Sequence, residues 1–368
     1  MDALARRGVS LSVIVAGRHD DPVAPVEPSP GASWQYVRQA GGRAKWRTDV
    51  TRRIASIAPD VVLLEHGARL DFSWTVLTSP GVHARKILWT HGIERRERFT
   101  GRLSIGGVGR WCQLRLAHGV VCYDEETAEK LRGHLKGKVI GFARNTIDRT
   151  DLSLERQTLV KIGRGAHQRA IGLPNRQYLV ALGRLIEEKE FHRVPGVARI
   201  AKTTGLDLGV IFIGEGPERG RIEAACEAAG FRMGQDAFMP GEITNPRQLM
   251  SWLFAAELCV NPGCLGLSVV DCAYAGVPIV SVAPGQKGPY HGPEWKYVSE
   301  GATGWFARAN TDDAIAALVV DYLRRSEEER AAVEAACVAG AAANLGVDEM
   351  VDGMLRTCNA VLAASGRP

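Results

Sequence analysis

The sequence has no CxxC pair and no Cys/His spacing that is typical of a metal site. Its eight cysteines are scattered, at positions 112, 122, 226, 259, 264, 272, 337 and 358. Scattered cysteines are typical of reduced thiols. We therefore expect a cytoplasmic protein, and neither a disulfide scaffold nor a zinc protein.

Long apolar runs are also absent. No segment approaches the roughly 20 apolar residues that span a membrane, and there is no signal peptide, so we expect no spanning segment. The net charge of +5 is mild, and no basic stripe alternates with aromatic residues, which argues against a nucleic-acid partner. The 45% apolar and 24% charged residues are ordinary for a globular protein, and a length of 368 residues favours two domains.

The chain also lacks the strand that normally opens an α/β domain. Residues 1–7 have the pattern of a last helical turn, Gly8 ends it, and residues 11–16 form the first expected strand. This order predicts a shortened N-terminal domain, either in the protein or through a misassigned start codon.

What the chain does have is a repeated alternation of strand and helix patterns. The alternation predicts parallel sheets covered on both faces, with ligands beyond the carboxyl ends of the strands. We expect an N-terminal Rossmann-like domain at 1–150 and an irregular, charged linker at 151–176. A second Rossmann-like domain is expected at 177–345, and a C-terminal helix at 346–368 is expected to pack back on the first domain.

The stretch 256–283 is the most informative. A short apolar strand leads into the turn Pro262–Gly266, and a helix follows from Leu267 to Ala275. Free N–H groups at such a helix start bind anions, and the short acid Asp271 one turn later suits a pair of hydroxyl groups. The alternative is an ordinary strand-turn-helix connection without a ligand.

Two cations follow the strand expected at 178–182. Arg184 comes just after its end and Lys189 five residues later. A planar fork and a point charge at such a turn suit a diphosphate. The alternative is a solvated surface pair neutralised by Glu187 and Glu188.

Two histidines follow strands in the first half of the chain. His66 comes after the strand expected at 61–64 and His91 after the one at 86–89. A lone histidine there is more often a structural hydrogen-bonder. His91 is the better functional candidate, because Gly92 beside it lets a substrate approach and imidazole can donate to a hydroxyl or phosphate.

Glycine turns end further strands of the second half, at Gly214 and Gly241. The sequence Gly214-Glu215-Gly216-Pro217 lacks the GxGxxG spacing of a dinucleotide site. The loop 284–292, rich in glycine and proline, is long enough to form a lid.

In order, the second half contains GRLIEEK, IGEGP, PGE, NPGCLGLSVVDCAYAGVPIV and PEWKYVSEGATGWF. These motifs resemble the donor-binding half of retaining glycosyltransferases of family 4, which have the GT-B fold of two Rossmann-like domains facing across a cleft. PDVVLLEHG, ILWTHG and RNTID in the first half resemble the same family more faintly.

The resemblance implies roles for individual residues. Arg184 and Lys189 would bind the donor diphosphate, Asp271 the ribose hydroxyls, and His91 would lie beside the donor sugar. The remaining donor-binding positions that the resemblance implies are Gly183, Gly214, Gly241, Gly263, Gly266, Leu267 and Ser268.

One departure concerns the two glutamates that the family has eight positions apart, where this chain has Gly263 and Asp271. A subgroup of the family has PG-x-x-GL at the turn and a PE pair after the lid. In that subgroup Glu294 would supply a carboxylate to the sugar; alternatively, Glu294 caps a helix.

The implied function is metal-independent, retaining transfer of a sugar from a nucleoside-diphosphate donor to a hydroxyl acceptor, with no other cofactor. Cell-surface polysaccharide or glycolipid synthesis is the implied setting. The alternatives are a non-catalytic nucleotide-sugar-binding protein, suggested by Gly263, and a GT-B sugar-nucleotide epimerase. The cluster Arg95, Arg96, Arg98 and Arg102 is either a solvated face or a contact for an anionic, lipid-linked acceptor or the inner face of the membrane.

Overall fold

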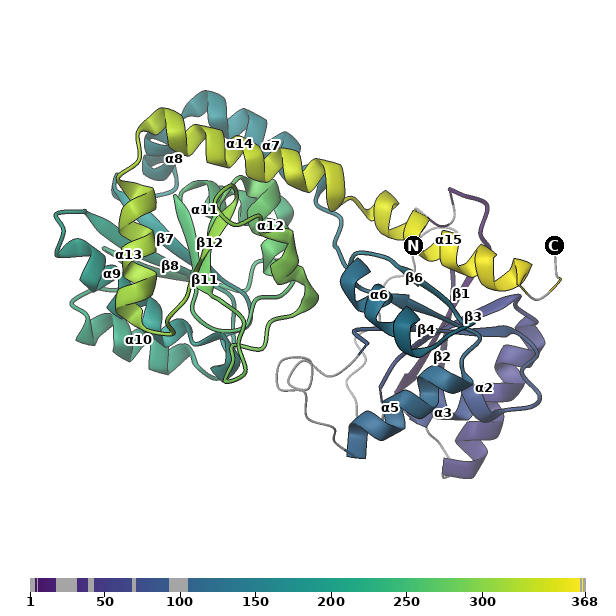
Figure 1. The fold of residues 1–368 in the computed structure, drawn as a ribbon. Helices are drawn as coiled ribbons and strands as arrows, with labels where there is room; N and C mark the ends of the chain where they lie inside the picture. Colours follow the sequence, from purple (N-terminus) through teal and green to yellow (C-terminus); the bar gives the residue numbers. More distant parts are fainter. Residues whose placement is uncertain are drawn as a thin grey trace. The chain divides into compact units, whose positions relative to one another are not determined.

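The computed structural model describes residues 4, 6–17, 32–38, 43–67, 71–92, 105–364 and 366. The chain forms two compact units (Figure 1). Unit 1 comprises Met1–Arg144 and Val347–Pro368, and unit 2 comprises Asn145–Gly346. Both are α/β units with parallel sheets, which confirms the expected fold class.

Unit 1 is built around a four-stranded parallel sheet in the order β3-β4-β5-β6. A separate parallel pair precedes it and is formed by β1 and β2. The sequence pattern predicted β1 but not β2. The bounds are β1 Leu11–Gly17, β2 Ala32–Arg38, β3 Val61–Glu65, β4 Arg85–Thr90, β5 Gly119–Cys122 and β6 Val139–Phe142.

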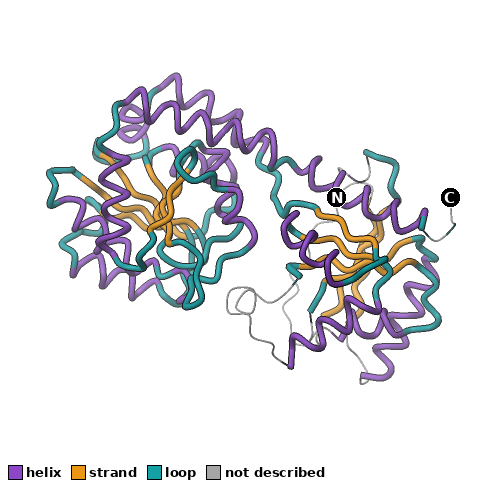
Figure 2. Tube along the Cα trace, viewed as in Figure 1, coloured by secondary structure: helices purple, strands orange, loops and turns teal. Residues whose placement is uncertain are grey.

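The helices of unit 1 lie on opposite faces of the four-stranded sheet, whose strands are orange in Figure 2. One face packs against α2, α3, α5 and α6 through a core that includes Val50, Leu88 and Leu131. The other face packs against α15 through Met354 and Val361. The bounds are α2 Arg43–Ile57, α3 Asp71–Thr78, α5 Ile105–Leu116, α6 Glu125–His134 and α15 Val347–Ala363.

Close backbone approach fixes α15 against this sheet. A Cβ on Gly141 would stand 1.9 Å from Oγ1 of Thr357, so only glycine fits where helix and strand meet. Arg7 adds ion pairs to Asp348 and Asp352 of α15, each at 2.8 Å. The C-terminal helix therefore belongs to unit 1.

Unit 2 contains a six-stranded parallel sheet in the order β12-β11-β10-β7-β8-β9. Counted from β7, this is the 3-2-1-4-5-6 order of the Rossmann fold, whose topological switch point lies between β7 and β10. The bounds are β7 Gln177–Leu182, β8 Leu208–Ile213, β9 Ala237–Gly241, β10 Leu258–Asn261, β11 Ile279–Val282 and β12 Gly304–Ala307.

Alternate residues of β7 face the two helix layers of unit 2. Leu179 and Ala181 join the core under α9, α10 and α13, while Tyr178 and Val180 join the core under α7 (Thr150–Ile162), α11 and α12. Helix α14 contributes to both cores. Period-two burial on both faces is expected for a sheet covered on both sides. The bounds of the second half's helices are α9 Val194–Lys202, α10 Arg219–Ala228, α11 Pro246–Phe254, α12 Ser268–Ala275, α13 Asp312–Leu323 and α14 Glu327–Asn344.

The expected irregular linker at 151–176 is wrong. Most of these residues form α7 (Thr150–Ile162) and α8 (Arg164–Ala170), both within unit 2. Their charges conceal the helices because they form partly buried ion pairs, such as Arg164 with Glu334 at 2.7 Å. The unit boundary falls instead at residues 144 and 145.

No membrane-spanning segment was expected, yet the stretch Glu327–Ala363 is long and apolar enough to cross a membrane by length and composition alone. The structure divides it into α14 and α15. Each buries one side against its own unit, α14 against α12 and α15 against β5 and β6.

Candidate functional site

The candidate donor site lies at the switch point of the unit 2 sheet. There β7 and β10 are neighbours, and their carboxyl ends lead into Gly183-Arg184 and into Pro262–Gly266. Ligands of doubly wound sheets bind at this position. Every residue that the resemblance assigned to the donor lies in unit 2, with the exception of His91, which belongs to unit 1.

Hydrogen bonds join the two turns. The amides of Gly263 and Cys264 donate to the carbonyl oxygens of Lys189 and Glu188, at 3.1 and 2.7 Å. In return, Nζ of Lys189 donates to the carbonyl of Cys264 at 2.8 Å. Lys189 is thereby held between the turns, and its Nζ lies 3.8 Å from the Cβ position of both Gly183 and Gly266.

This arrangement explains Gly263. A Cβ on residue 263 would stand 2.2 Å from the carbonyl oxygen of Glu188, which no real structure tolerates. The position where the resembled family has its first glutamate therefore cannot hold a side chain while the two turns are joined.

The N-terminus of α12 supplies free donors. The amides of Val269 and Val270 bond to the carbonyls of Gly266 and Leu267. The N–H groups of Gly266, Leu267 and Ser268 have no acceptor among the residues that the structure describes. Unpaired N–H groups at a helix start, with Lys189 beside them, favour an anion.

Arg184 adds a second cation. It is exposed, and it forms no hydrogen bond or ion pair with the described part of the chain. Glu187 and Glu188 form no ion pair with Arg184. The alternative, in which these two glutamates neutralise the cations at the surface, is therefore not supported for Arg184. Its planar fork remains available for a phosphate.

Close turns complete this edge of the sheet. A Cβ on Gly214 would stand 2.0 Å from the carbonyl oxygen of Gly183, and the Gly214 amide donates to Gly241 at 2.9 Å. The turns that end β7, β8 and β9 are therefore in direct backbone contact. The Cβ position of Gly241 lies next to the carboxylate of Glu215.

Asp271 is 7% exposed and lies one turn inside α12. Its Oδ1 accepts a hydrogen bond from Nε of Arg149 at 2.5 Å. Burial raises the pKa of Asp271, while the hydrogen bond and the charge of Arg149 oppose that rise. The other carboxylate oxygen makes no hydrogen bond to a described residue, so it can accept one from a ligand hydroxyl.

Glu294 is 3% exposed, in the 3-10 turn Pro293–Tyr297. It does not cap that turn, so the capping alternative is wrong. Its Oε1 instead accepts from the amide nitrogen of Asn145 at 2.7 Å, and its Oε2 lies over Gly292, 2.3 Å from where a Cβ would stand. The Gly292 amide donates to Leu265, which places Glu294 beside the turn before α12.

His291 fixes the end of the loop expected to be a lid. It is fully buried; its Nδ1 accepts from the Leu265 amide and its Nε2 donates to the Val282 carbonyl, both at 2.9 Å. Sequence reasoning missed three of these supporting residues, Asn145, Arg149 and His291. Only Asn145 had a signal, because it lies in the RNTID motif.

In unit 1 the two histidines differ. His66 accepts from the Thr90 hydroxyl at 2.5 Å and donates to the Arg110 carbonyl at 3.0 Å, and burial lowers its pKa to about 4. His66 is therefore a neutral structural residue. His91 is exposed, and its ring stacks on Tyr123 with centroids 4.1 Å apart. The cluster Arg95, Arg96, Arg98 and Arg102 lies outside the described residues.

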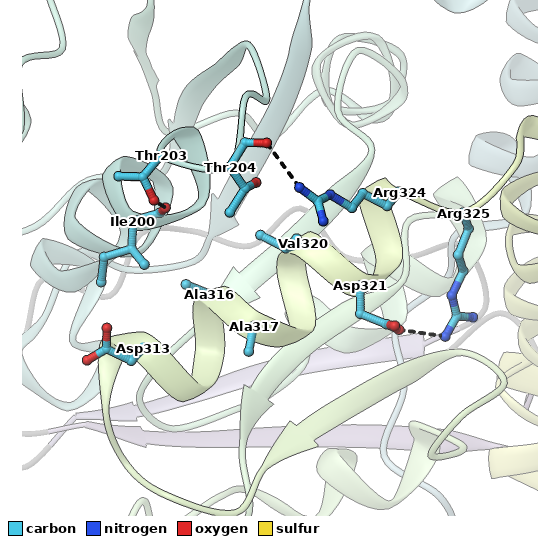
Figure 3. Close-up of a pocket in the computed structure, with 10 residues that line it drawn as sticks. All are labelled: Ile200, Thr203, Thr204, Asp313, Ala316, Ala317, Val320, Asp321, Arg324 and Arg325. Carbon is cyan, nitrogen blue, oxygen red and sulfur yellow. Dashed lines mark hydrogen bonds and ion pairs between the residues drawn. The ribbon is translucent and has the colours of Figure 1, made fainter.

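One hollow of about 660 Å³ lies elsewhere in unit 2, between α9 and α13, where Arg324 donates to the carbonyl of Thr204 at 3.0 Å (Figure 3). It is lined by helix side chains, such as Ile200 and Val320, and by none of the predicted donor residues. Among the described residues, no group of three or more His, Cys, Asp or Glu side chains is arranged to hold a metal ion.

Comparison with protein families matches residues 164–337 to the model of glycosyl transferases group 1. A curated relative, the 2-deoxystreptamine glucosyltransferase of Streptomyces kanamyceticus, is 27% identical over 191 residues, which are 49% of this chain and 46% of that protein. The chain therefore spans about half the length of this relative. Residues 164–337 are thus similar to group 1 glycosyl transferases, and the curated relative is a glucosyltransferase.

Solved structures show the same fold. Sucrose-phosphate synthase from Thermosynechococcus elongatus has a TM-score of 0.71 at 16% identity, covering 98% of this chain and 91% of that one. HepE from Anabaena, in complex with UDP and glucose, has a TM-score of 0.63 at 12% identity, covering 89% and 86%. WaaG, a glycosyltransferase involved in lipopolysaccharide biosynthesis, has a TM-score of 0.63 at 12% identity, covering 98% and 93%. The fold is GT-B, as the resemblance implied.

Proposed function

We propose that the protein is a glycosyltransferase that moves a sugar from a nucleoside-diphosphate sugar to a hydroxyl acceptor. The observation that supports the proposal is the pair of joined turns at the switch point of the unit 2 sheet. Lys189 lies beside the unpaired N–H groups of 266–268, and the exposed Arg184 follows the end of β7. The group 1 domain match covers the same region.

In the proposed mechanism the leaving diphosphate gains negative charge as the glycosidic bond breaks. Arg184, Lys189 and the start of α12 stabilise that charge without rearranging, because they are already in place. Two cations and a helix N-terminus suffice for this, so we propose transfer without a metal ion. We also propose retention of configuration, with the leaving phosphate accepting the proton of the acceptor hydroxyl.

Two carboxylates are proposed to bind the rest of the donor. Asp271 accepts from the ribose hydroxyls through its free oxygen, and Glu294 does the same for the transferred sugar. Since Gly263 has no room for a side chain, Glu294 takes over the role of the family's first glutamate. His91 is proposed to contact the donor sugar from unit 1.

The wider setting is part of the proposal. It includes membership of glycosyltransferase family 4, a cytoplasmic location and a role in cell-surface polysaccharide or glycolipid synthesis. WaaG, which shares the fold, is a glycosyltransferase of lipopolysaccharide biosynthesis, and this supports such a role. Contact of the Arg95–Arg102 cluster with a lipid-linked acceptor or an anionic membrane surface is proposed with it.

Incubation with UDP-, GDP-, ADP- and dTDP-sugars, with simple hydroxyl acceptors and in EDTA, tests the proposal. We expect one nucleoside diphosphate to be released in an acceptor-dependent reaction, and NMR of the product to show the anomeric configuration of the donor. Donor binding with neither transfer nor hydrolysis would instead favour the non-catalytic binding protein, which the missing carboxylate at Gly263 suggests. Inversion would exclude the proposed mechanism.

A further inference from the structure

The first five residues of unit 2, called here the leading segment (residues 145–149), contact both candidate donor carboxylates. Asn145 at one end holds Glu294, and Arg149 at the other holds Asp271. The two acids come from different elements, a 3-10 turn and α12. We propose that Asn145 and Arg149 are positioning residues that set donor specificity, Asn145 for the transferred sugar and Arg149 for the ribose.

Asn145 is fixed before any ligand arrives. Its carbonyl accepts from the hydroxyl of Tyr297 at 3.0 Å while its side chain donates to Glu294 at 2.7 Å. Both partners belong to the same 3-10 turn. The backbone anchor survives truncation of the Asn145 side chain, so the contact with Glu294 can be removed by itself.

Glu294 needs such a partner. It is 3% exposed, and Asn145 is the one described residue that donates to it. A buried carboxylate has room for about four hydrogen bonds. The bond to Oε1 fixes the orientation of the carboxylate and leaves Oε2 for a sugar hydroxyl next to the turn that precedes α12.

Arg149 acts in the same way on Asp271. It precedes the first turn of α7, and α7 packs against α12. Its Nε donates to Oδ1 of Asp271, and its Nη1 donates to the Asp148 carbonyl at 3.3 Å. Asp271 is one methylene shorter than the glutamate of the resembled family, so the direction in which its free oxygen points depends on this contact.

The leading segment also contains a matched control. Thr146, between the two positioning residues, is 7% exposed and donates to the Leu345 carbonyl at 2.6 Å. It contacts neither carboxylate. Thr146→Val removes a buried hydrogen bond from the same segment and should leave donor specificity unchanged.

The inference rests on the proposed function, and calorimetric titration of the full chain tests both. The probes are UDP, 2′-deoxy-UDP and UDP-glucose, or the equivalent set for whichever base the wild type binds. We expect Asn145→Ala to weaken UDP-glucose about tenfold and leave UDP unchanged, because a hydrogen bond to a charged group is lost. We expect Arg149→Ala to abolish an approximately tenfold preference for UDP over its 2′-deoxy form, and Arg149→Lys to restore most of it.

Each outcome has a separate meaning. If the wild type binds no nucleoside diphosphate, the proposed function fails and this inference fails with it. Two affinity ratios decide the rest: UDP-glucose to UDP, and UDP to 2′-deoxy-UDP. If the wild type binds, and if Asn145→Ala keeps the first ratio and Arg149→Ala keeps the second, the positioning roles are wrong and the proposed function stands. If Thr146→Val changes these two ratios as much as Asn145→Ala and Arg149→Ala do, the leading segment has a general structural role, which also contradicts the inference. Thermal melts of all variants check that each of them folds.

Discussion

The carbonyl oxygen of Glu188 accepts a hydrogen bond from the amide of Cys264, with 2.7 Å between nitrogen and oxygen. The same oxygen occupies the space that a side chain at the preceding residue, Gly263, would need. A second bond between the same two turns, from Nζ of Lys189 to the carbonyl of Cys264, holds Lys189 next to the start of α12. The lack of a side chain where the resembled family has its first glutamate and the position of Lys189, the proposed diphosphate-binding lysine, thus both follow from the bonds that join the two turns.

Introducing the glutamate of the resembled family at position 263 should therefore destabilise the protein. We expect Gly263→Glu to lower the free energy of unfolding by about 2–3 kcal/mol, because its Cβ would overlap the Glu188 carbonyl. Urea denaturation measures the change. Gly266→Ala is the matched control, since its Cβ would lie in ordinary contact, 3.8 Å from Nζ of Lys189. Wild-type stability in Gly263→Glu would show that the turns are not joined as described.

Lys189 should contribute directly to nucleotide affinity. We expect Lys189→Met to weaken UDP binding about 10- to 100-fold, because a charge-assisted contact with the diphosphate is lost. Lys161→Met, a neutralisation of an exposed lysine on α7, is the control for net charge. Equal affinities of the two variants in calorimetry would remove Lys189 from the anion site.

Much of the fold and of the site follows from the sequence. The pattern predicted β7, β10 and α12 to within about a residue, because buried strands and a glycine-capped helix have strong local signals. It missed α7 and α8, whose polar residues are satisfied by partners far away in the sequence. For the same reason it identified Asp271 and Glu294 but not the contacts with Arg149 and Asn145, which join residues more than a hundred positions apart.

Glu257 should make unit 2 less stable as the pH rises. Its Oε2 accepts from the Tyr178 amide, and burial raises its pKa to about 7, although Arg164 opposes the rise. The folded state therefore retains a proton that the unfolded state loses above about pH 4.5. We expect the stability of wild type relative to Glu257→Gln to fall by up to about 3 kcal/mol between pH 4.5 and 7. Urea denaturation of both proteins across this pH range measures the change. A difference in the free energy of unfolding that stays constant with pH would contradict the prediction.

His66 should have the opposite effect in unit 1. Its folded-state pKa of about 4 lies below the ordinary value, so the unfolded state takes up a proton first as the pH falls. We expect the free energy of unfolding of unit 1 to fall by up to about 3 kcal/mol between pH 6.5 and 4, and we expect His66→Gln to remove most of that fall. Tryptophan fluorescence combined with NMR of the His66 ring can follow it. Titration of the ring near pH 6.5 would show that the folded state does not hold His66 in its neutral form.

The most direct test of the anion site is calorimetric titration of UDP, GDP, ADP and dTDP into the wild type and Arg184→Ala. Arg184 has no partner among the described residues, so its removal should leave the fold intact and act on the ligand alone. The account predicts that the wild type binds one of the four and that Arg184→Ala binds it about tenfold or more weakly, at an unchanged melting temperature. Binding of a nucleotide with equal affinity by both proteins, or of none by the wild type, would contradict the proposed diphosphate site.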